Sequence, residues 1–501
     1  MTRLIGIDLG TSSVKVVVID ENGRLLGVGT REYPIHTPQP SFAEQEPEDW
    51  WRASTAALRE AITLSGSAPD AIRGIGLCGQ MHGPALVDSG GAPVGPAIIW
   101  PDQRSVIEVQ EIFDLVGAET LARVAGTAPA TGFLAPTLRW LRKHDPGRLD
   151  RAAACLLPKD YVRLRLTGEI ATEASDASAT AMFDIRRRTW SEDIVRALDI
   201  PARLLPRVLD SAEVAGMLTR EAAEMLGLLP GVPVVAGSAD QAAHAVGSGL
   251  LDPGIGSVAV GTGGQLISVL TAPQADPGLR LHTFCHAHPE RWYVLGAMLA
   301  AGLSLRWLRN TLGMAGDPDA YEKLAALAAQ APPASGGLLF LPYLVGERSP
   351  LMDPLARGCF VGLTLRHELG HMVRAIMEGV AFAMRQILDI ILAFELPVER
   401  LLAVGNGMGS PVWRQIMADV LARPLHLAAE GERPGVGAAL IAGIGAGVYR
   451  DYDEVRAVVG RGGLPAVTTP DPERARQYDD HYARFLQVYP ALRPVMHDLR
   501  G

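Results

Sequence analysis

The chain has 501 residues, 48% hydrophobic and 20% charged, which is typical of a globular protein long enough for two or three domains. Its formal net charge of −9 excludes a general attraction to nucleic acid or to an anionic membrane, so phosphates must be bound locally. Four scattered cysteines without a CxxC pair, and no apolar run approaching about 18 residues, predict a cytoplasmic protein with reduced thiols and no transmembrane helix.

Residues 4–19 predict two strands joined by a turn of small residues at Gly10-Thr11. Backbone N–H groups in such a turn can approach phosphate oxygens closely. Asp8 stands two residues before the turn and could hold Mg²⁺, usually through water. The alternative is an ordinary hairpin turn with a capping aspartate.

A helix is predicted to begin at Pro47, which suits a first helical turn, with Glu48 and Asp49 at its positive end. The next strand, 74–79, runs into GQMHG (79–83), which carries Gln80 and His82. A single histidine is more often structural than catalytic, so this segment alone decides nothing.

The loop IIWPDQR (98–104) offers Trp100, Asp102 and Arg104, either as binding groups or as a surface turn with a local ion pair. Further on, the apolar strand VPVVAG (232–237) leads into GSADQAA, where Asp240 is the one acid among small residues. Burying a carboxylate at the end of a strand costs folding free energy, so its presence there suggests a functional role. A domain boundary is predicted near 246–254.

Residues 255–270 repeat the plan of the first hairpin, and Gly261-Thr262 corresponds to Gly10-Thr11. This weak internal match suggests two domains with related cores. GTGGQ (261–265) is a second candidate phosphate loop. HTFCHAH (282–288) resembles a metal-ligand cluster, but we expect no zinc, because an extended strand sends alternate residues to opposite faces and no second cluster accompanies it.

Apolar residues recur at spacings of three and four over 371–392, which predicts a helix with a buried face. The strand 400–407 then enters GNGMGS (405–410), a third glycine-rich turn that would suit a nucleotide base. Alternating strands and helices of this kind favour an α/β chain.

Seven segments in order resemble the FGGY family of carbohydrate kinases over nearly the whole chain. They are GIDLGTSSVK, EQEPEDWW, GQMHG, LLPKDYVRLRLTGE, FCHAHPERW, FLPYLVGERSP and GCFVGLTLRHELGHMVRAIMEG. The resemblance implies an α/β protein with the two-domain actin-like, ribonuclease H-like fold of the sugar kinase superfamily and a cleft between the domains. It places the sugar and the catalytic base on residues 1–246 and the nucleotide on 247–501, with the last helix expected to pack back on the first domain.

The resemblance also implies roles for residues at matching positions. Asp240 is expected to be the general base, and Asp8 to assist the metal. The residues expected to bind sugar are Gln80, Met81, His82, Trp100, Asp102, Arg104, Asp240 and Gln241. Those expected near the nucleotide are Thr11, Ser12, Lys15, Gly261, Thr262, Gly263, Gly405 and Gly407. An unperturbed aspartate, with a pKa of about 3.9, would be ionised at neutral pH and ready to accept a proton.

The activity implied is transfer of phosphate from ATP, with Mg²⁺, to the terminal hydroxyl of D-xylulose, with another ketose, a pentitol, gluconate or glycerol as alternatives. Five positions depart from the family pattern: Pro101, Thr137, Gln241, Asn406 and Gly409. Glycerol kinases also carry a glutamine after the base, but they have an Arg-Glu pair where this chain has Met81-His82.

The superfamily also contains ATP-binding chaperones and inactive sugar-binding regulators. Asp240 argues against an inactive regulator, and residues 451–501 are too few for a chaperone's peptide-binding module. The expected partners are a sugar and ATP, with no nucleic acid and no membrane, and the resemblance implies a homodimer.

Overall fold

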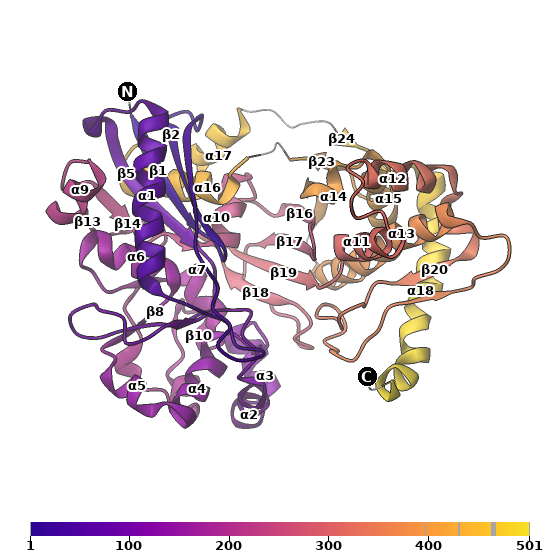
Figure 1. The fold of residues 1–501 in the computed structure, drawn as a ribbon, viewed down its shortest axis with the longest axis horizontal. Helices are drawn as coiled ribbons and strands as arrows, with labels where there is room; N and C mark the ends of the chain where they lie inside the picture. The colour runs from indigo at the N-terminus through magenta and orange to yellow at the C-terminus, as the bar shows by residue number, and fades with distance from the viewer. Residues whose placement is uncertain (1, 396, 429–430, 462–466, 500–501) are drawn as a thin grey trace.

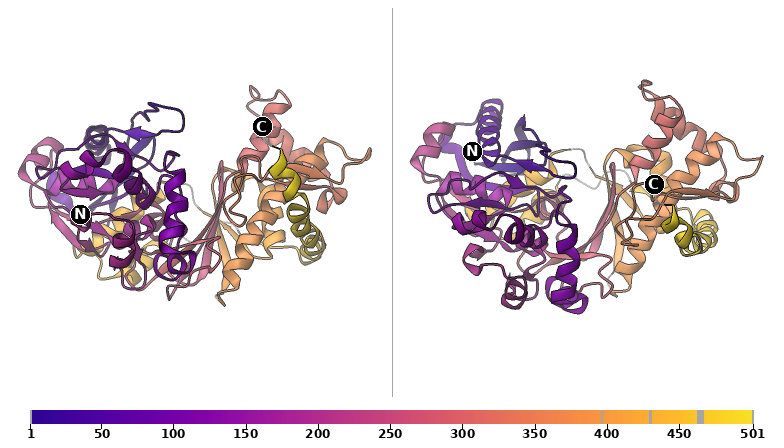
Figure 2. Two further views of the ribbon diagram at one scale, coloured as in Figure 1. Left: turned by 90° about the horizontal axis from the view of Figure 1, so that it is seen from below. Right: turned by 60° about the horizontal axis from the view of Figure 1, so that its bottom comes forward.

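The computed structural model describes residues 2–395, 397–428, 431–461 and 467–499, which form two lobes side by side (Figures 1 and 2). Each lobe is built on a mixed sheet of seven strands among these residues. The first sheet has the order β13-β14-β5-β1-β2-β3, with β15 paired to β5. Its strands are β1 (Arg3–Leu9), β2 (Ser13–Asp20), β3 (Leu25–Glu32), β5 (Ile72–Gly79), β13 (Val214–Met217), β14 (Pro233–Val235) and β15 (Ser238–Ala239).

The second sheet has the order β18-β19-β17-β16-β22-β23-β24. Its strands are β16 (Gly254–Val260), β17 (Gly264–Leu270), β18 (His282–Cys285), β19 (Trp292–Met298), β22 (Val398–Val404), β23 (Leu425–Leu427) and β24 (Val467–Thr468). In both sheets an antiparallel hairpin is joined to a parallel strand, β1–β2 to β5 and β16–β17 to β22. The two related cores inferred from the sequence are confirmed by this shared topology.

Helices cover both faces of the first sheet. The first face is covered by α1 (Pro47–Ser65), which packs on β2 and β3 and begins at Pro47 as predicted. The other face is covered by α16 (Arg433–Gly445), which lies against β1, β5 and α10 (Asp240–Gly247). The remaining helices of this lobe include α2 (Val106–Val116), α4 (Leu134–His144), α6 (Pro158–Thr167), α7 (Ala174–Ala177), α8 (Glu192–Ala197) and α9 (Arg220–Leu226).

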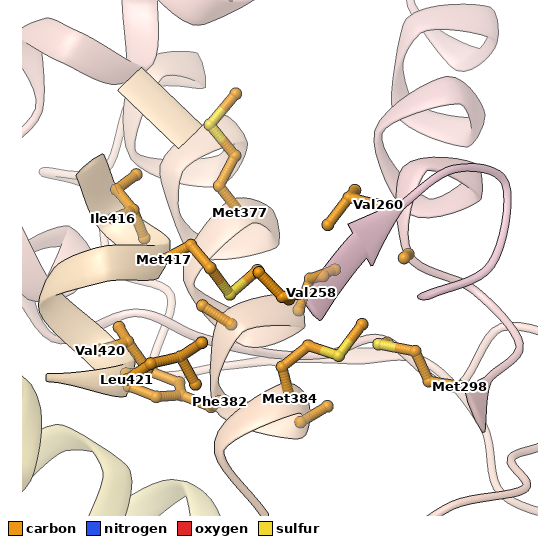
Figure 3. Close-up of a cluster of buried hydrophobic side chains, with 14 of the residues drawn as sticks. Val258, Val260, Met298, Met377, Phe382, Met384, Ile416, Met417, Val420 and Leu421 are labelled. Atoms are coloured by element: carbon orange, nitrogen blue, oxygen red, sulfur yellow. The ribbon is translucent and has the colours of Figure 1, made fainter. Parts of the chain in front are cut away.

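The core of the second lobe lies between its sheet and two helices, α13 (Leu369–Leu392) and α15 (Pro411–Leu421). The predicted helix over 371–392 is therefore confirmed, and its apolar face is buried. In Figure 3, Met298, Met384 and Met417 gather around Val258 of β16. Unbranched methionine side chains fill irregular gaps, so this core can pack closely beneath the end of the hairpin.

The chain order and the lobes do not coincide at the C-terminal end. Residues 433–445 of α16 and α17 (Tyr452–Gly460) lie with the first lobe, although they follow most of the second (Figure 1). The contact is close because small residues meet there. A Cβ on Gly6 would overlap the Gly435 carbonyl oxygen, and one on Gly437 would overlap that of Ala243.

The last helix, α18 (Pro472–Asp498), does not pack back on the first lobe, and that expectation was wrong. It lies at the far side of the second lobe against α13 and α15 (Figure 1). Tyr478, Tyr482 and Phe485 are buried against α13. The Tyr478 hydroxyl also bonds to Glu378 at 2.7 Å and accepts from Arg374 at 2.7 Å, which fixes the helix there.

The edge strand β18 joins the two lobes. The Thr283 backbone N–H donates to the Gly126 carbonyl at 2.8 Å, and the Cys285 N–H donates to the Ser178 hydroxyl at 3.0 Å. The second sheet is thus anchored to the first lobe next to α7. No helix in the described part of the chain is long and apolar enough to cross a lipid bilayer.

Candidate active site

Three neighbouring strands of the first sheet bring Asp8 and Asp240 to one edge. Asp8 of β1 lies beside Cys78 of β5, and Ser238 of β15 lies on the other side of Cys78. Asp240 follows β15 directly as the first residue of α10. Parallel strands end at a common edge, so Asp8 and Asp240 lie at the same edge of the first sheet.

Burial controls the charge of both carboxyls. It raises the pKa of Asp240 to about 7, with a further rise from the Asp8 carboxylate and an opposing effect from the Gln241 N–H, which donates to Asp240 Oδ1 at 2.6 Å. Burial also raises the pKa of Asp8 to about 6, against the Cys78 thiol and Lys15. The sequence predicted an ordinary aspartate at 240, and the raised pKa differs from that because desolvation of the carboxyl depends on segments that are distant in the chain.

A cavity of about 210 Å³ lies beside Asp240. It is lined by six of the predicted sugar-binding residues: Gln80, Met81, His82, Trp100, Asp240 and Gln241. Gln80 Nε2 donates to Gln45 at 2.9 Å, while Gln80 Oε1 is buried without a partner among the described residues. Since an unsatisfied buried acceptor costs about 1–3 kcal/mol, this oxygen is suited to a ligand hydroxyl.

His82 is held as a neutral acceptor. Its ring stacks on Phe133 with centroids 3.8 Å apart, and Nδ1 lies 2.9 Å from the Ala179 carbonyl. Burial lowers the pKa of His82 to about 3. A carbonyl can only accept, so Nδ1 carries the proton and Nε2 is left as an acceptor.

Asp102 and Arg104 do not line this cavity, unlike Trp100. Asp102 is buried and accepts from the Ala43 N–H at 2.7 Å, and Arg104 pairs with Asp102 at 2.8 Å and with Glu44 at 2.7 Å. These bonds fix the loop from which Trp100 Nε1 donates to the Thr11 hydroxyl at 2.8 Å. The local ion pair considered as an alternative is what the structure shows.

A second cavity, of about 310 Å³, opens at the turn between β16 and β17. Five of its lining residues come from the glycine-rich turns singled out in the sequence: Gly261, Thr262, Asn406, Gly407 and Ser410. Arg306, Tyr321 and Trp413 also line it, and the sequence had not indicated them. The cavity combines backbone N–H groups at a turn with apolar and aromatic surface, as a nucleotide requires.

Gly263 and Gly405 shape this second cavity without lining it. A Cβ on Gly263 would lie 2.7 Å from the Met298 carbonyl oxygen. Gly405 has a φ of 85°, and its Cβ would lie 2.8 Å from the Val260 carbonyl oxygen. Both turns therefore require glycine.

The first glycine turn contributes differently from the second. Thr11 lines the cavity beside Asp240, whereas Ser12 is exposed at the tip of the hairpin. Lys15 Nζ pairs with Glu432 at 3.0 Å and is 41% exposed. The three residues predicted near the phosphates therefore lie in different surroundings: Thr11 in a cavity wall, Ser12 at a loop tip and Lys15 in an ion pair.

Comparison with known proteins places this geometry in a family. Residues 3–247 match the N-terminal domain model of the FGGY family of carbohydrate kinases, and residues 256–446 match its C-terminal domain model. The chain belongs to the FGGY family of carbohydrate kinases. This confirms the resemblance seen in the sequence and the two-domain actin-like fold that it implied.

Three relatives define the similarity. A xylulose kinase of Lactococcus lactis is 36% identical over 501 residues, covering 100% of this chain and 99% of the relative. The structure of a xylulose kinase from Rhodospirillum rubrum is 33% identical, covers 99% of this chain and 100% of that one, and has a TM-score of 0.92. A gluconokinase of Bacillus subtilis is 29% identical and covers 95% of this chain and 93% of the relative.

The second lobe supplies six of the fourteen residues that line the cavity beside Asp240 in this kinase, and the sequence reasoning missed them. The residues are Gln265, His282, Phe284, Leu295, Ala297 and Arg348. Two lie in family segments already noticed, FCHAHPERW and FLPYLVGERSP, but no local pattern marked them as binding groups. Burial lowers the pKa of His282 to about 4, so it is neutral beside Arg348.

The residues of HTFCHAH are placed apart from one another. His282 faces the cavity, Cys285 Sγ points to the Ile185 carbonyl at 3.7 Å, and His286 Nε2 lies 3.0 Å from the Leu250 carbonyl. Within the described ranges no group of three or more histidine, cysteine, aspartate or glutamate residues could hold a metal ion by itself.

The raised pKa of Asp240 predicts a pH dependence for the kinase. A general base must be unprotonated, so kcat/KM for the sugar is expected to rise with pH through about 7 and to level off above it. Between about pH 7 and 6 it should fall about tenfold per pH unit, because Asp240 binds one proton, and it should fall more steeply below about 6, where Asp8 is protonated as well. Initial rates from pH 5.5 to 9 in buffers of constant ionic strength measure this, and a profile that stays flat down to pH 5.5 would contradict it.

Proposed function

We propose that this kinase transfers the γ-phosphate of ATP to the terminal hydroxyl of D-xylulose, giving D-xylulose 5-phosphate and ADP. The observation that carries the proposal is the cavity beside Asp240, whose polar wall comes from both lobes. Gln80 Oε1 and His82 Nε2 are free acceptors there, and Arg348 and Gln241 offer donors. A ketopentose, with several hydroxyls and a carbonyl, can satisfy both kinds of group.

Asp240 is the proposed general base. The oxygen of the terminal hydroxyl attacks the γ-phosphorus, and the bond from that phosphorus to the β–γ bridging oxygen breaks. The hydroxyl proton passes to Asp240, and the electron pair of the broken bond leaves with ADP. Because Asp240 accepts only the Gln241 N–H among the described residues, it keeps an oxygen available for the sugar.

The residues present fit a magnesium ion. Asp8 is a half-buried carboxylate whose sole hydrogen-bond donor among the described side chains is the weak Cys78 thiol, at 3.6 Å, and Asp240 lies at the same sheet edge. Mg²⁺ prefers oxygen ligands and usually takes one or two carboxylates, with waters and phosphates as the rest. Bound there with ATP, it would neutralise charge on the phosphate oxygens, and Asp8 is the residue proposed to hold it.

The proposal predicts discrimination against a small polyol. Glycerol has fewer groups to satisfy the cavity wall and would leave buried polar atoms unpaired at about 1–3 kcal/mol each. We expect kcat/KM for D-xylulose to be at least about tenfold above that for glycerol, a difference of about 1.4 kcal/mol. His82→Ala should narrow the ratio without changing the affinity for ATP. A coupled assay of ADP release with both substrates measures this ratio. Equal or better use of glycerol would contradict the assignment of D-xylulose as the substrate but not the assignment of the protein as a kinase.

Gluconate is the second candidate, because of Arg348. Arg348 lines the cavity, and its guanidinium interacts electrostatically with Glu347 but makes no hydrogen bond or ion pair with the described residues. A carboxylate would pair with it directly. Rates with gluconate and with D-xylulose, measured for the wild type and for Arg348→Met, distinguish the two substrates. If the wild type prefers gluconate and Arg348→Met loses that preference, gluconate is the substrate and D-xylulose is not.

Two further expectations accompany this function. Action in the cytoplasm is supported by the four free cysteines, three of them buried, and by the use of ATP. A homodimer rests on the family resemblance, and light scattering of the purified protein would test it.

A further inference from the structure

A group of charged side chains is buried next to the segment that leads to Asp240, and neither substrate cavity is lined by any of them. Its members are Lys159, Asp160, Arg163, Glu173 and Asp176, and the side chains of all five are fully buried. Burying charges costs more than their mutual attraction returns unless their geometry is good and further hydrogen bonds support them. A packed apolar core would be the simpler solution for stability, so the position of these charges calls for another reason.

The charges form one connected network. Lys159 Nζ lies 2.8 Å from Asp160, 3.4 Å from Glu173 and 3.0 Å from Asp176. Arg163 pairs with Asp160 at 2.7 Å. The helix α6 supplies the two cations and Asp160, while Glu173 ends β9 (Thr172–Glu173) and Asp176 lies in α7.

This network holds the segment that leads to Asp240. Arg163 Nη1 donates to the Ala236 carbonyl at 2.7 Å, and the Ala239 N–H donates to the Ser175 hydroxyl at 3.0 Å. The same hydroxyl donates to Glu173 Oε1 at 3.0 Å. The residue immediately before the base is therefore bonded through Ser175 to a buried carboxylate.

Glu173 is itself fixed in orientation. It accepts from the backbone N–H groups of Ser175 at 2.6 Å and Asp176 at 2.9 Å, and from the Ser211 hydroxyl at 3.1 Å. The Ser211 carbonyl accepts from the Gly237 N–H at 3.0 Å. Two routes thus run from Glu173 to residues 237–239, one through Ser175 and one through Ser211.

The backbone at Gly237 has a conformation and a close contact that only glycine accommodates. Gly237 has a φ of 88°, and a Cβ there would overlap the Leu77 carbonyl oxygen. The chain turns sharply between β14 and β15 and then starts α10 with Asp240. A misplacement of a catalytic group by about 1 Å can cost about a hundredfold in rate, so the position of Ala239 matters for the chemistry.

We propose that Ser175 and Glu173 are positioning residues for the catalytic base, holding the backbone at Ala239 so that Asp240 meets the sugar hydroxyl. The inference rests on the proposed role of Asp240. It assigns a catalytic purpose to charges that lie outside the substrate cavities. It also predicts that loss of the Ser175 hydroxyl lowers kcat rather than substrate binding.

The test is Ser175→Ala in the full-length enzyme, with Thr180→Val as the matched control. The Thr180 hydroxyl is buried in the same segment, donates to the Ala177 carbonyl at 2.7 Å and accepts from the Met182 N–H at 3.3 Å, and it makes no hydrogen bond to residues 236–239. We expect Ser175→Ala to lose about tenfold in kcat with both KM values within about twofold, and Thr180→Val to keep kcat within about twofold. Denaturant unfolding of both variants compares their stability.

Ser211→Ala, which removes one donor to Glu173, should lower kcat by about threefold and serves if Ser175→Ala does not fold. The inference is overturned if Ser175→Ala and Ser211→Ala keep wild-type kcat, or if Thr180→Val loses as much kcat at equal stability. Asp240→Asn is assayed alongside. If that variant is active, the proposed base is wrong; if it is inactive while the serine variants are normal, the positioning inference alone fails.

Discussion

Asp240→Asn is expected to lower kcat by about 10²–10⁴, because a carboxamide cannot accept the hydroxyl proton. The side chain keeps its shape, and the Gln241 N–H that donates at 2.6 Å to Asp240 Oδ1 can donate equally to an amide oxygen. Affinities for D-xylulose and for ADP should therefore stay within about threefold of wild type. Calorimetry of binding and a coupled assay of turnover measure the two effects separately.

Asp252→Asn provides the matched control. It makes the same substitution at an aspartate that pairs with Arg456 at 2.7 Å on the surface, where an ion pair contributes at most about 1 kcal/mol. Its kcat should equal that of the wild type. An Asp240→Asn enzyme with a rate within about threefold of wild type would remove Asp240 from the role of base.

Gly261→Val is expected to raise the KM for ATP by about tenfold to a hundredfold, since each tenfold corresponds to about 1.4 kcal/mol. Gly261 lines the second cavity, and a Cβ there would have only one neighbour within 4 Å, the Gly263 carbonyl oxygen at 3.7 Å. The protein itself can thus accept the valine, whose methyl groups would occupy space proposed for the nucleotide. Titration with ADP and a KM for ATP at saturating sugar measure the loss.

Gly316→Val is the control for this substitution. Gly316 has no heavy atom within 4 Å of its ideal Cβ and lies in the loop between α11 (Gly302–Thr311) and α12 (Ala320–Gln330). Its KM for ATP should be unchanged. If Gly261→Val is folded and binds nucleotide as tightly as this control, the turn at 261–263 does not approach phosphate.

The sequence predicted the elements with a strong local pattern. Both Gly-Thr hairpins, the helix over 371–392 and the isolated acid at Asp240 carry their own periodicity or composition, and the structure has them where they were expected. Six predicted sugar-binding residues line one cavity. Five of them follow β5 or β15, which are paired at one edge of the first sheet, whereas Trp100 comes from the loop after β7 (Ala97–Ile98) of a separate sheet. Their assignment to the sugar remains a prediction.

What the sequence could not predict depends on contacts between distant segments. Gln265, His282 and Arg348 reach the cavity from the other lobe, and nothing near them in the chain marks this. Asp102 and Arg104 lie outside the lining of this cavity and pair with each other, and the sequence alone could not decide between that ion pair and a binding role. The pKa of Asp240 likewise depends on burial by several elements together.

The return of α16 to the first lobe has a consequence for how the molecule is made. Leu4, Val17 and Ile19 are fully buried in a cluster that includes Ala439, Leu440 and Ala442 of that helix. On the ribosome these partners emerge more than four hundred residues after β1, so the first sheet has one face uncovered through most of synthesis. A fragment that ends at Val246 would expose that apolar face, and we expect it to aggregate. A separate peptide of residues 433–460 would be needed to cover the exposed face of the sheet. The two halves of this enzyme are separate lobes in space, but they are one unit of folding.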